Sequence, residues 1–114
     1  MEILLVRHGQ AGKPDAAAYP DDDLRPLTPK GRKEFKRAGK GLRRLRPETE
    51  KILFSPAERT RETAELLARS LDLAEKDLLE VPELHHGVSP AGALARLTRL
   101  RLPRRVALVG HEPW

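Results

Sequence analysis

Two histidines of this chain each follow closely on a short apolar run, and the first stands beside an arginine. Arg7 and His8 come after residues 3–6, and His111 comes shortly after residues 106–109. Such runs are typical of buried strands in a parallel sheet, whose ligands bind beyond the carboxyl ends of the strands. An arginine fork fits the oxygens of a phosphate, and an unprotonated imidazole can attack phosphorus. These residues therefore indicate phosphate chemistry.

The residues around His8 have the properties that such an attack requires. A neighbouring cation disfavours imidazolium, so Arg7 helps to keep His8 neutral near pH 7. Gly9 permits a tight turn and a close approach of the backbone to a bound group. The alternative interpretation is a chance tripeptide at a strand end, in which His8 is only hydrogen-bonded.

A second candidate anion site follows the strand predicted at residues 51–54. Ser55 and Glu58 have the spacing of a capping box, and the proline after the serine suits the first helical position. A helix N-terminus offers free N–H groups and the positive end of its dipole to an anion. Arg59 is predicted on the first turn and can reach the same crevice, whereas Arg61 is expected to point elsewhere. The alternative is an ordinary capped helix with a surface arginine.

His111 and Glu83 are two further candidate groups at strand ends. The imidazole of His111 can donate to a phosphoryl oxygen and stabilise charge in the transition state. Glu83 follows a strand predicted at residues 78–81, and it can protonate a leaving group as a general acid. A hydrogen-bonded loop histidine and a solvent-exposed glutamate are the corresponding alternatives.

The sequence predicts no metal site. His85 and His86 are adjacent, and neighbouring side chains of an extended chain point in opposite directions. They therefore form a poor chelating pair, and a loop role is favoured. The acidic run at residues 21–23 lacks the spacing of a calcium-binding loop, so we expect no required metal.

The elements that position these residues alternate between strand and helix. A long polar connection at residues 10–27 follows the first strand, and a loop of this length usually has a function such as covering a site. This alternation predicts an α/β fold, in which a mostly parallel central sheet is the middle of three α/β/α layers. The first predicted helix starts at Pro29, is capped by Thr28 and buries Phe35, Ala38, Leu42 and Leu45. A second helix ends near Leu71, a third starts at Pro90, and the last strand covers residues 105–109.

Length and composition limit the class of protein. The 114 residues predict one domain over residues 1–114, and the net charge of +5 fits a solvated surface or attraction to acidic partners. The chain has no cysteine, which excludes a disulfide framework and a thiolate zinc site. No segment resembles a membrane span or a signal peptide, so we expect a soluble, cytoplasmic protein. Because aromatic residues are scarce, a surface that stacks single-stranded nucleic acid is not expected.

Together these motifs resemble the histidine phosphatase superfamily, in its phosphoglycerate-mutase-like branch. The small SixA-type phosphohistidine phosphatases are the more similar group, since no large insertion precedes Glu83. The matching segments, in chain order, are Arg7-His8-Gly9, Arg25-Pro26-Leu27-Thr28 after an acidic loop, the Ser55-Pro56 turn with Arg59, and Gly110-His111.

The resemblance implies a phosphoglycerate-mutase-like fold and a phosphatase that forms a phosphohistidine intermediate on His8. It implies no metal or organic cofactor, and a phosphorylated protein such as a histidine phosphotransfer domain as substrate. Typical relatives continue past the second histidine with a helix and a strand, so we expect this chain to lack both. The other implied pocket and catalytic residues are Arg7, Gly9, Ser55, Arg59, His111 and, near the proton donor of larger relatives, Glu83.

Two alternative functions stand beside this one. One is a phosphatase or mutase of the same superfamily that acts on a small phosphorylated metabolite. The other is a non-catalytic phosphate-binding module, which the early end of the chain and the basic first helix motivate. Nucleic-acid and membrane partners are not expected, and the sequence does not define an oligomeric state.

Overall fold

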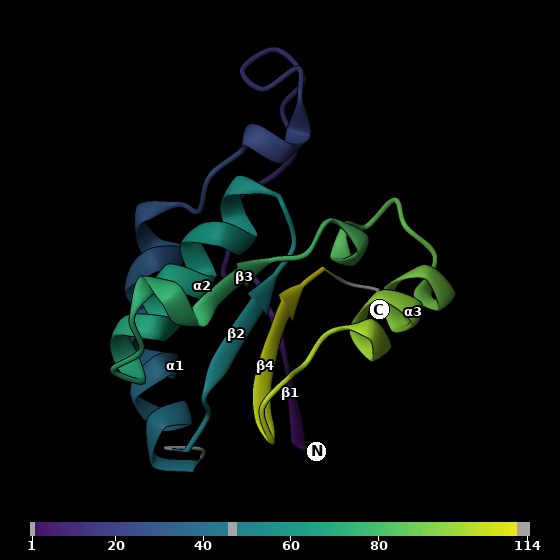
Figure 1. Cartoon of the computed structure of the whole chain (residues 1–114). Helices are drawn as coiled ribbons and strands as arrows, with labels where there is room; N and C mark the ends of the chain where they lie inside the picture. Colours follow the sequence, from purple (N-terminus) through teal and green to yellow (C-terminus); the bar gives the residue numbers. More distant parts are fainter. Residues whose placement is uncertain (1, 46–47, 112–114) are drawn as a thin grey trace.

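Four parallel strands form one sheet in this computed structural model, which describes residues 2–45 and 48–111 (Figure 1). Their spatial order is β1-β4-β2-β3. All three neighbouring pairs are parallel, so each connection is a crossover, as the alternating pattern predicts. The strands are β1 (Glu2–Arg7), β2 (Lys51–Phe54), β3 (Leu78–Glu80) and β4 (Arg105–Gly110).

Helices cover both faces of this sheet. Two of them pack together on one face and the third lies on the other, which confirms the predicted three-layer architecture (Figure 1). The helices are α1 (Pro29–Leu45), α2 (Glu58–Ser70) and α3 (Pro90–Arg99), and the short 3₁₀ turns are η1 (Asp22–Leu24), η2 (Glu75–Asp77) and η3 (Pro82–Leu84).

The side chains of β2 divide between two hydrophobic cores. Ile52 packs on the side of α1 and α2 with Phe35 and Leu67. The next residue, Leu53, packs on the opposite side with Leu97 of α3. This alternation follows from the pleat of a strand. Because β2 is buried on both faces, its sequence is an apolar run and not an alternating one.

The start of α1 is as predicted, but only part of its predicted buried face is buried. Thr28 caps the helix, since its Oγ1 accepts a hydrogen bond from the N–H of Gly31 at 2.9 Å. Phe35 is buried and Leu42 packs against the same core, as predicted. However, Ala38 is exposed and Leu45 is 68% exposed.

Two glycines occupy the buried stripe of α1 in their place. A Cβ at Gly31 would lie 2.1 Å from the carbonyl oxygen of Gln10, and one at Gly39 would lie 2.3 Å from Ser70 Oγ. Glycine is therefore required where α1 approaches the backbone of the loop after β1, whereas a side chain at Gly39 would have to displace that of Ser70 on α2. The prediction followed apolar side chains, so it overlooked residues that are buried because they have none.

The start of α2 also differs from the prediction. Ala57 is the N-cap residue, so the capping box between Ser55 and Glu58 is wrong. The reason is that the hydroxyl of Ser55 lies 2.8 Å from His111 Nε2 and is engaged there. Arg59 still lies on the first turn of α2, as predicted.

The strand register brings three strand ends to the same level. Arg7 of β1 is paired with Gly110 of β4, and Phe54 of β2 with Val109. The residues that follow β1, β2 and β4 therefore emerge side by side at the carboxyl edge of the sheet, where ligands bind in this class of fold.

The edge strand β1 has one covered and one exposed face. Val6 is buried in the core shared with α1 and α2, whereas Ile3 is 47% exposed and Leu5 is 57% exposed. Among the described residues, no helix combines the length and apolar character that crossing a membrane requires.

Candidate active site

Two imidazoles meet at the carboxyl edge of the sheet. His8 follows β1 and His111 follows β4, and their ring centroids lie 5.5 Å apart in an edge-to-face arrangement. The backbone holds both positions, because the N–H of His8 donates to the carbonyl of Gly110 at 3.1 Å. The structure thus brings together two predicted site residues that lie more than a hundred positions apart in the chain.

The hydrogen bonds of His8 define which ring nitrogen is free. Its Nδ1 lies 2.6 Å from the carbonyl oxygen of Gly9. A carbonyl can only accept, so Nδ1 carries a proton and the neutral ring has its lone pair on Nε2. Gly9 is fixed in turn, since its N–H donates to Thr63 Oγ1 at 3.0 Å. The lone pair of Nε2 is therefore available for attack.

Several effects keep His8 uncharged. Burial is the main reason that the pKa of His8 lies below its ordinary value of 6.5. The hydrogen bond to Gly9 opposes this shift, and the positive charges of Arg59, Arg7 and Arg25 add to it. The sequence predicted the contribution of Arg7, but the structure shows that burial and Arg59 act more strongly.

His111 is oriented by the serine after β2. Ser55 is fully buried, and its Oγ lies 2.8 Å from His111 Nε2. When this hydroxyl donates to Nε2, the neutral ring carries its proton on Nδ1 and can offer that N–H to an oxyanion. Burial, followed by the positive charge of Arg59, lowers the pKa of His111 from 6.5 to about 4.

Arg59 supplies a buried cation from the first turn of α2. It is only 4% exposed, and Asp22 holds it through the carbonyl oxygen at 2.8 Å and through Oδ2 at 3.2 Å. Its Nε is buried and has no hydrogen-bond partner in the described part of the chain. A buried donor of this kind is costly unless a ligand satisfies it, and a phosphate oxygen is a suitable acceptor.

Arg25 is a pocket residue that the sequence did not assign a role. Its guanidinium donates to the carbonyl oxygens of Ala11 at 3.0 Å and Gly12 at 2.8 Å, and its Nε pairs with Asp22 Oδ1 at 2.9 Å. Asp22 therefore links Arg25 to Arg59. The long loop after β1 is tied down in this way, which supports the prediction that it covers a site.

Arg7 and His8 line a hollow of about 550 Å³ with Arg25 and Lys13.

Thr63, which holds Gly9, is a second residue that the sequence analysis missed. It lies one helical turn after Arg59 and donates to the carbonyl of that residue at 2.7 Å. A polar residue on the buried face of the predicted helix was the signal that could have found it.

Glu83 stands apart from the first hollow. It lines a second one, of about 450 Å³, that also includes His85, His86 and His111. Its Oε1 faces Arg96 Nε of α3 at 3.7 Å. Its role as a proton donor stays a prediction. Arg61, which was excluded from the site, pairs with Glu58 and Glu65 on the surface.

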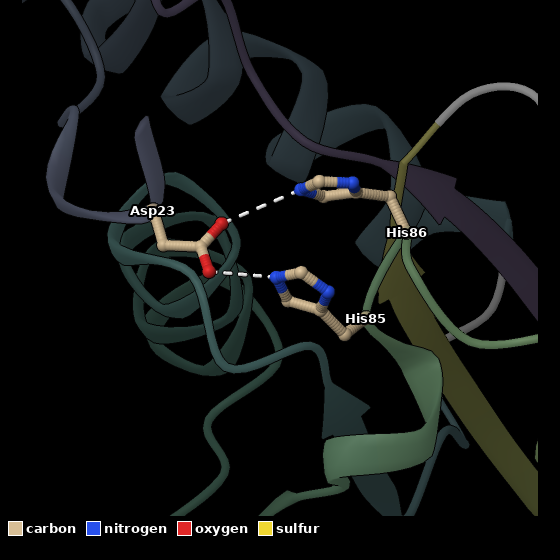
Figure 2. Close-up of side chains that lie close together, drawn as sticks. All are labelled: Asp23, His85 and His86. Atoms are coloured by element: carbon tan, nitrogen blue, oxygen red, sulfur yellow. Dashed lines mark hydrogen bonds and ion pairs between the residues drawn. The ribbon is translucent and has the colours of Figure 1, made fainter. Parts of the chain in front are cut away.

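The prediction for His85 and His86 is wrong in its geometry. Both rings point toward the carboxylate of Asp23, with Nε2 of His85 at 2.6 Å from Oδ2 and Nε2 of His86 at 3.4 Å from Oδ1 (Figure 2). The chain turns here instead of continuing extended, so neighbouring side chains share one side. The three groups have the composition of a metal site, with ligand atoms within 4.8 Å of one another.

A larger hollow lies away from these groups. It measures about 760 Å³ and is lined by basic residues of α1 and by Arg69 of α2. Arg43 is already paired there with Asp72 at 2.7 Å. This surface carries none of the candidate catalytic residues.

Known proteins share both the sequence pattern and the fold. The family model for the histidine phosphatase superfamily (branch 1) matches residues 3–93. A protein of Picosynechococcus sp. described as uncharacterized is 38% identical over 119 residues, which cover 99% of this chain and 67% of that protein.

Three solved structures extend the comparison. The protein histidine phosphatase SixA complexed with tungstate matches with a TM-score of 0.78 and 28% identity, covering 99% of this chain and 70% of that one. A structure from Nakamurella multipartitia described as a phosphohistidine phosphatase SixA has a TM-score of 0.74 and 29% identity. The match covers 97% of this chain and 59% of that one. A structure from Agrobacterium tumefaciens, also described as SixA, is 24% identical and has the same fold, with a TM-score of 0.80. The match covers 97% of this chain and 69% of that one.

Proposed function

The chain belongs to the histidine phosphatase superfamily, and from that premise we propose that it is a phosphatase that uses His8 as its nucleophile. The family and the SixA-like structure support phosphatase activity. The observation that carries the assignment of the residues is the meeting of His8 and His111 at 5.5 Å beside the unpaired, buried Nε of Arg59.

The proposed reaction has two steps. Nε2 of His8 attacks the phosphorus in line, the bond to the leaving group breaks, and the enzyme becomes a phosphohistidine. Water then attacks this intermediate, and phosphate leaves as the bond to Nε2 breaks. Two observations support the first step. The hydrogen bond to the Gly9 carbonyl keeps the ring proton on Nδ1 and so leaves the lone pair on Nε2, and the pKa of His8 is lowered.

The remaining groups contribute position and charge. In the proposal Arg7, Arg59 and His111 bind the equatorial oxygens of the transferring phosphoryl group, where negative charge is spread. Gly9 borders the same space, and Ser55 orients His111. No step is assigned to a metal or cofactor.

A phosphohistidine protein is the substrate we propose. The support is similarity to the SixA phosphatases, one of which is complexed with tungstate, a tetrahedral oxyanion like phosphate. A phosphoramidate also suits a site rich in imidazole, because its P–N bond breaks readily once the nitrogen is protonated. A small phosphorylated metabolite is the alternative, and comparing phosphohistidine protein with sugar and nucleotide phosphates separates the two.

The test is to trap the intermediate. Purified protein is incubated briefly with a ³²P-labelled phosphohistidine protein and then denatured. We expect label on the wild-type chain that is labile in acid and stable in base, and none on His8→Ala. A non-catalytic phosphate-binding module would retain no covalent label. Wild-type turnover by His8→Ala would refute the assignment of the nucleophile.

A further inference from the structure

All four histidines of the chain gather at one place, and only two of them have a part in the proposed function. His111 is the link between the pairs, since its ring centroid lies 5.5 Å from that of His8 and 5.0 Å from that of His86. His8 lines one hollow, whereas His111 and His86 line the other. The nucleophile and His86 therefore face different spaces that adjoin at His111.

An in-line displacement gives these two spaces different roles. The nucleophile and the leaving group must lie on opposite sides of phosphorus. This step rests on the proposed function: His8 attacks from its own hollow while Arg59 and His111 hold the phosphoryl oxygens. The leaving group then faces the hollow of about 450 Å³ that His86 lines.

Hydrogen bonds hold the carboxylate of Asp23, which faces the ring of His86. The N–H of Gly87 donates to His85 Nδ1 at 3.1 Å, so the neutral ring of His85 carries its proton on Nε2. That N–H donates to Asp23 Oδ2 at 2.6 Å and holds the carboxylate (Figure 2). The other oxygen, Oδ1, faces His86 Nε2 at 3.4 Å, which leaves His86 Nδ1 for the hollow.

We propose that His86 is the general acid that protonates the leaving group, and that Asp23 is its positioning residue. Histidine is the side chain whose ordinary pKa suits proton transfer near neutral pH. The titratable groups around it are Asp23, Asp22, His85 and His111, together with Glu83, which lines the same hollow.

The carboxylate of Asp23 supports this pairing. Burial alone would raise the pKa of Asp23, but the hydrogen bonds and charges of His85 and His86 together lower it. Asp23 is therefore an anion that can accompany a positive imidazole. Glu83, the donor predicted from the sequence, lines the same hollow, and its Oε1 lies 3.7 Å from Arg96 Nε.

The proton balance closes over the two steps. In the first, a bond forms between His8 Nε2 and phosphorus, the bond to the leaving oxygen or nitrogen breaks, and His86 gives its proton to that atom. In the second, neutral His86 takes a proton from the attacking water as the bond to His8 breaks. Phosphate leaves, and both histidines return to their initial states.

The same side chains also have the composition of a divalent metal site. A metal on His85 Nε2 requires that nitrogen to be unprotonated and Nδ1 to carry the proton. The Nδ1 proton would then oppose the N–H of Gly87, which now donates to that nitrogen. The hydrogen-bond pattern therefore favours a proton over a metal.

The test varies the need of the leaving group for a proton. Phenyl phosphate needs one, whereas 2,4-dinitrophenyl phosphate releases a stable anion. For His86→Gln we expect kcat/KM to fall about 10²- to 10³-fold with phenyl phosphate and less than about threefold with the dinitrophenyl ester, which is the size of a general-acid effect. The decline of wild-type kcat/KM on the alkaline side should disappear in His86→Gln.

Two further variants separate the roles. Asp23→Asn should show the same selective loss at a smaller size, because it disturbs the ring without removing the acid. Glu83→Gln should change kcat/KM for both esters by the same factor. The dinitrophenyl ester also serves as the control for folding, since a damaged site loses both reactions.

Each outcome decides between the explanations. An equal loss with both esters in His86→Gln overturns the proposal, as does a selective loss in Glu83→Gln. A wild-type rate that EDTA abolishes and Zn²⁺ restores indicates a metal instead. If the wild type hydrolyses neither ester and forms no phosphohistidine, the proposed function itself fails.

Discussion

The two sides of the candidate pocket are held by different forces. On the strand side, His8 and His111 are fixed by hydrogen bonds to Gly110, Gly9 and Ser55, directly beyond the strand ends. These bonds are at least partly buried and involve main chain or a neutral hydroxyl. Their geometry is therefore set by the fold and depends little on salt.

On the loop side, charges hold the pocket. Asp22 pairs with Arg25 and Arg59, and Asp23 faces His85 and His86. Arg25 and Arg59 are buried but Asp22 is 44% exposed, so solvent weakens each pair toward the value of about 1 kcal/mol that surface ion pairs have. The sheet therefore fixes the position of the nucleophile, whereas the acidic residues of the loop after β1 hold the cationic and imidazole groups around it.

The largest expected effect comes from the residue that joins both sides. Arg59→Ala removes the buried guanidinium, and we expect kcat to fall by roughly 10²- to 10³-fold, as for a lost oxyanion donor. The measurement is steady-state hydrolysis of an aryl phosphate.

Arg61→Ala is the matched control, because Arg61 lies on the same helix but pairs only with surface carboxylates. It should retain the wild-type rate within about threefold, as for a surface substitution. Equal losses in both variants would show that helix stability, not the pocket, accounts for the effect.

The second prediction concerns pH and the strand side. The pKa of His111 is about 4 in the folded chain and 6.5 without burial, so the unfolded state binds more protons between these values. The free energy of unfolding should therefore rise with pH from about 4 to 6.5, by about 2–3 kcal/mol. Urea titrations across this range measure it.

His111→Gln should lose much of that pH dependence, since the group that titrates is gone. A slope that stays the same in this variant would show that another group, such as His8 with its own lowered pKa, is responsible.

The smallest expected effect separates hydrogen bonding from charge. Ser55→Ala removes the partner of His111 Nε2 and should lower kcat/KM about tenfold, the equivalent of one buried hydrogen bond. Asp22→Asn removes a charge on the loop side but keeps the main-chain carbonyl that holds Arg59, so kcat/KM should change by less than about threefold. If the asparagine variant were the slower of the two, the comparison between the two sides would be reversed.

Much of the fold follows from local patterns in the sequence. The four strands and three helices lie where apolar runs and signals such as the Thr28 cap predict them. The errors arose where tertiary contacts override local signals. Ser55 has the spacing of a cap but binds His111, and Gly31 is buried because α1 approaches the loop.

The candidate site was predictable only in part. His8, Arg59 and His111 stand at fixed positions relative to strands, so the chain order of elements is enough to bring them together. The loop side required coordinates. Nothing local to Asp23 indicates that it faces His85 and His86, more than sixty residues further along the chain.

A crystal structure of the wild-type protein with tungstate tests the central claim most directly. We expect one oxyanion in contact with Arg7, Arg59 and His111, with His8 Nε2 facing the tungsten atom. An anion bound elsewhere, or one that touches His8 without Arg59 and His111, would contradict it.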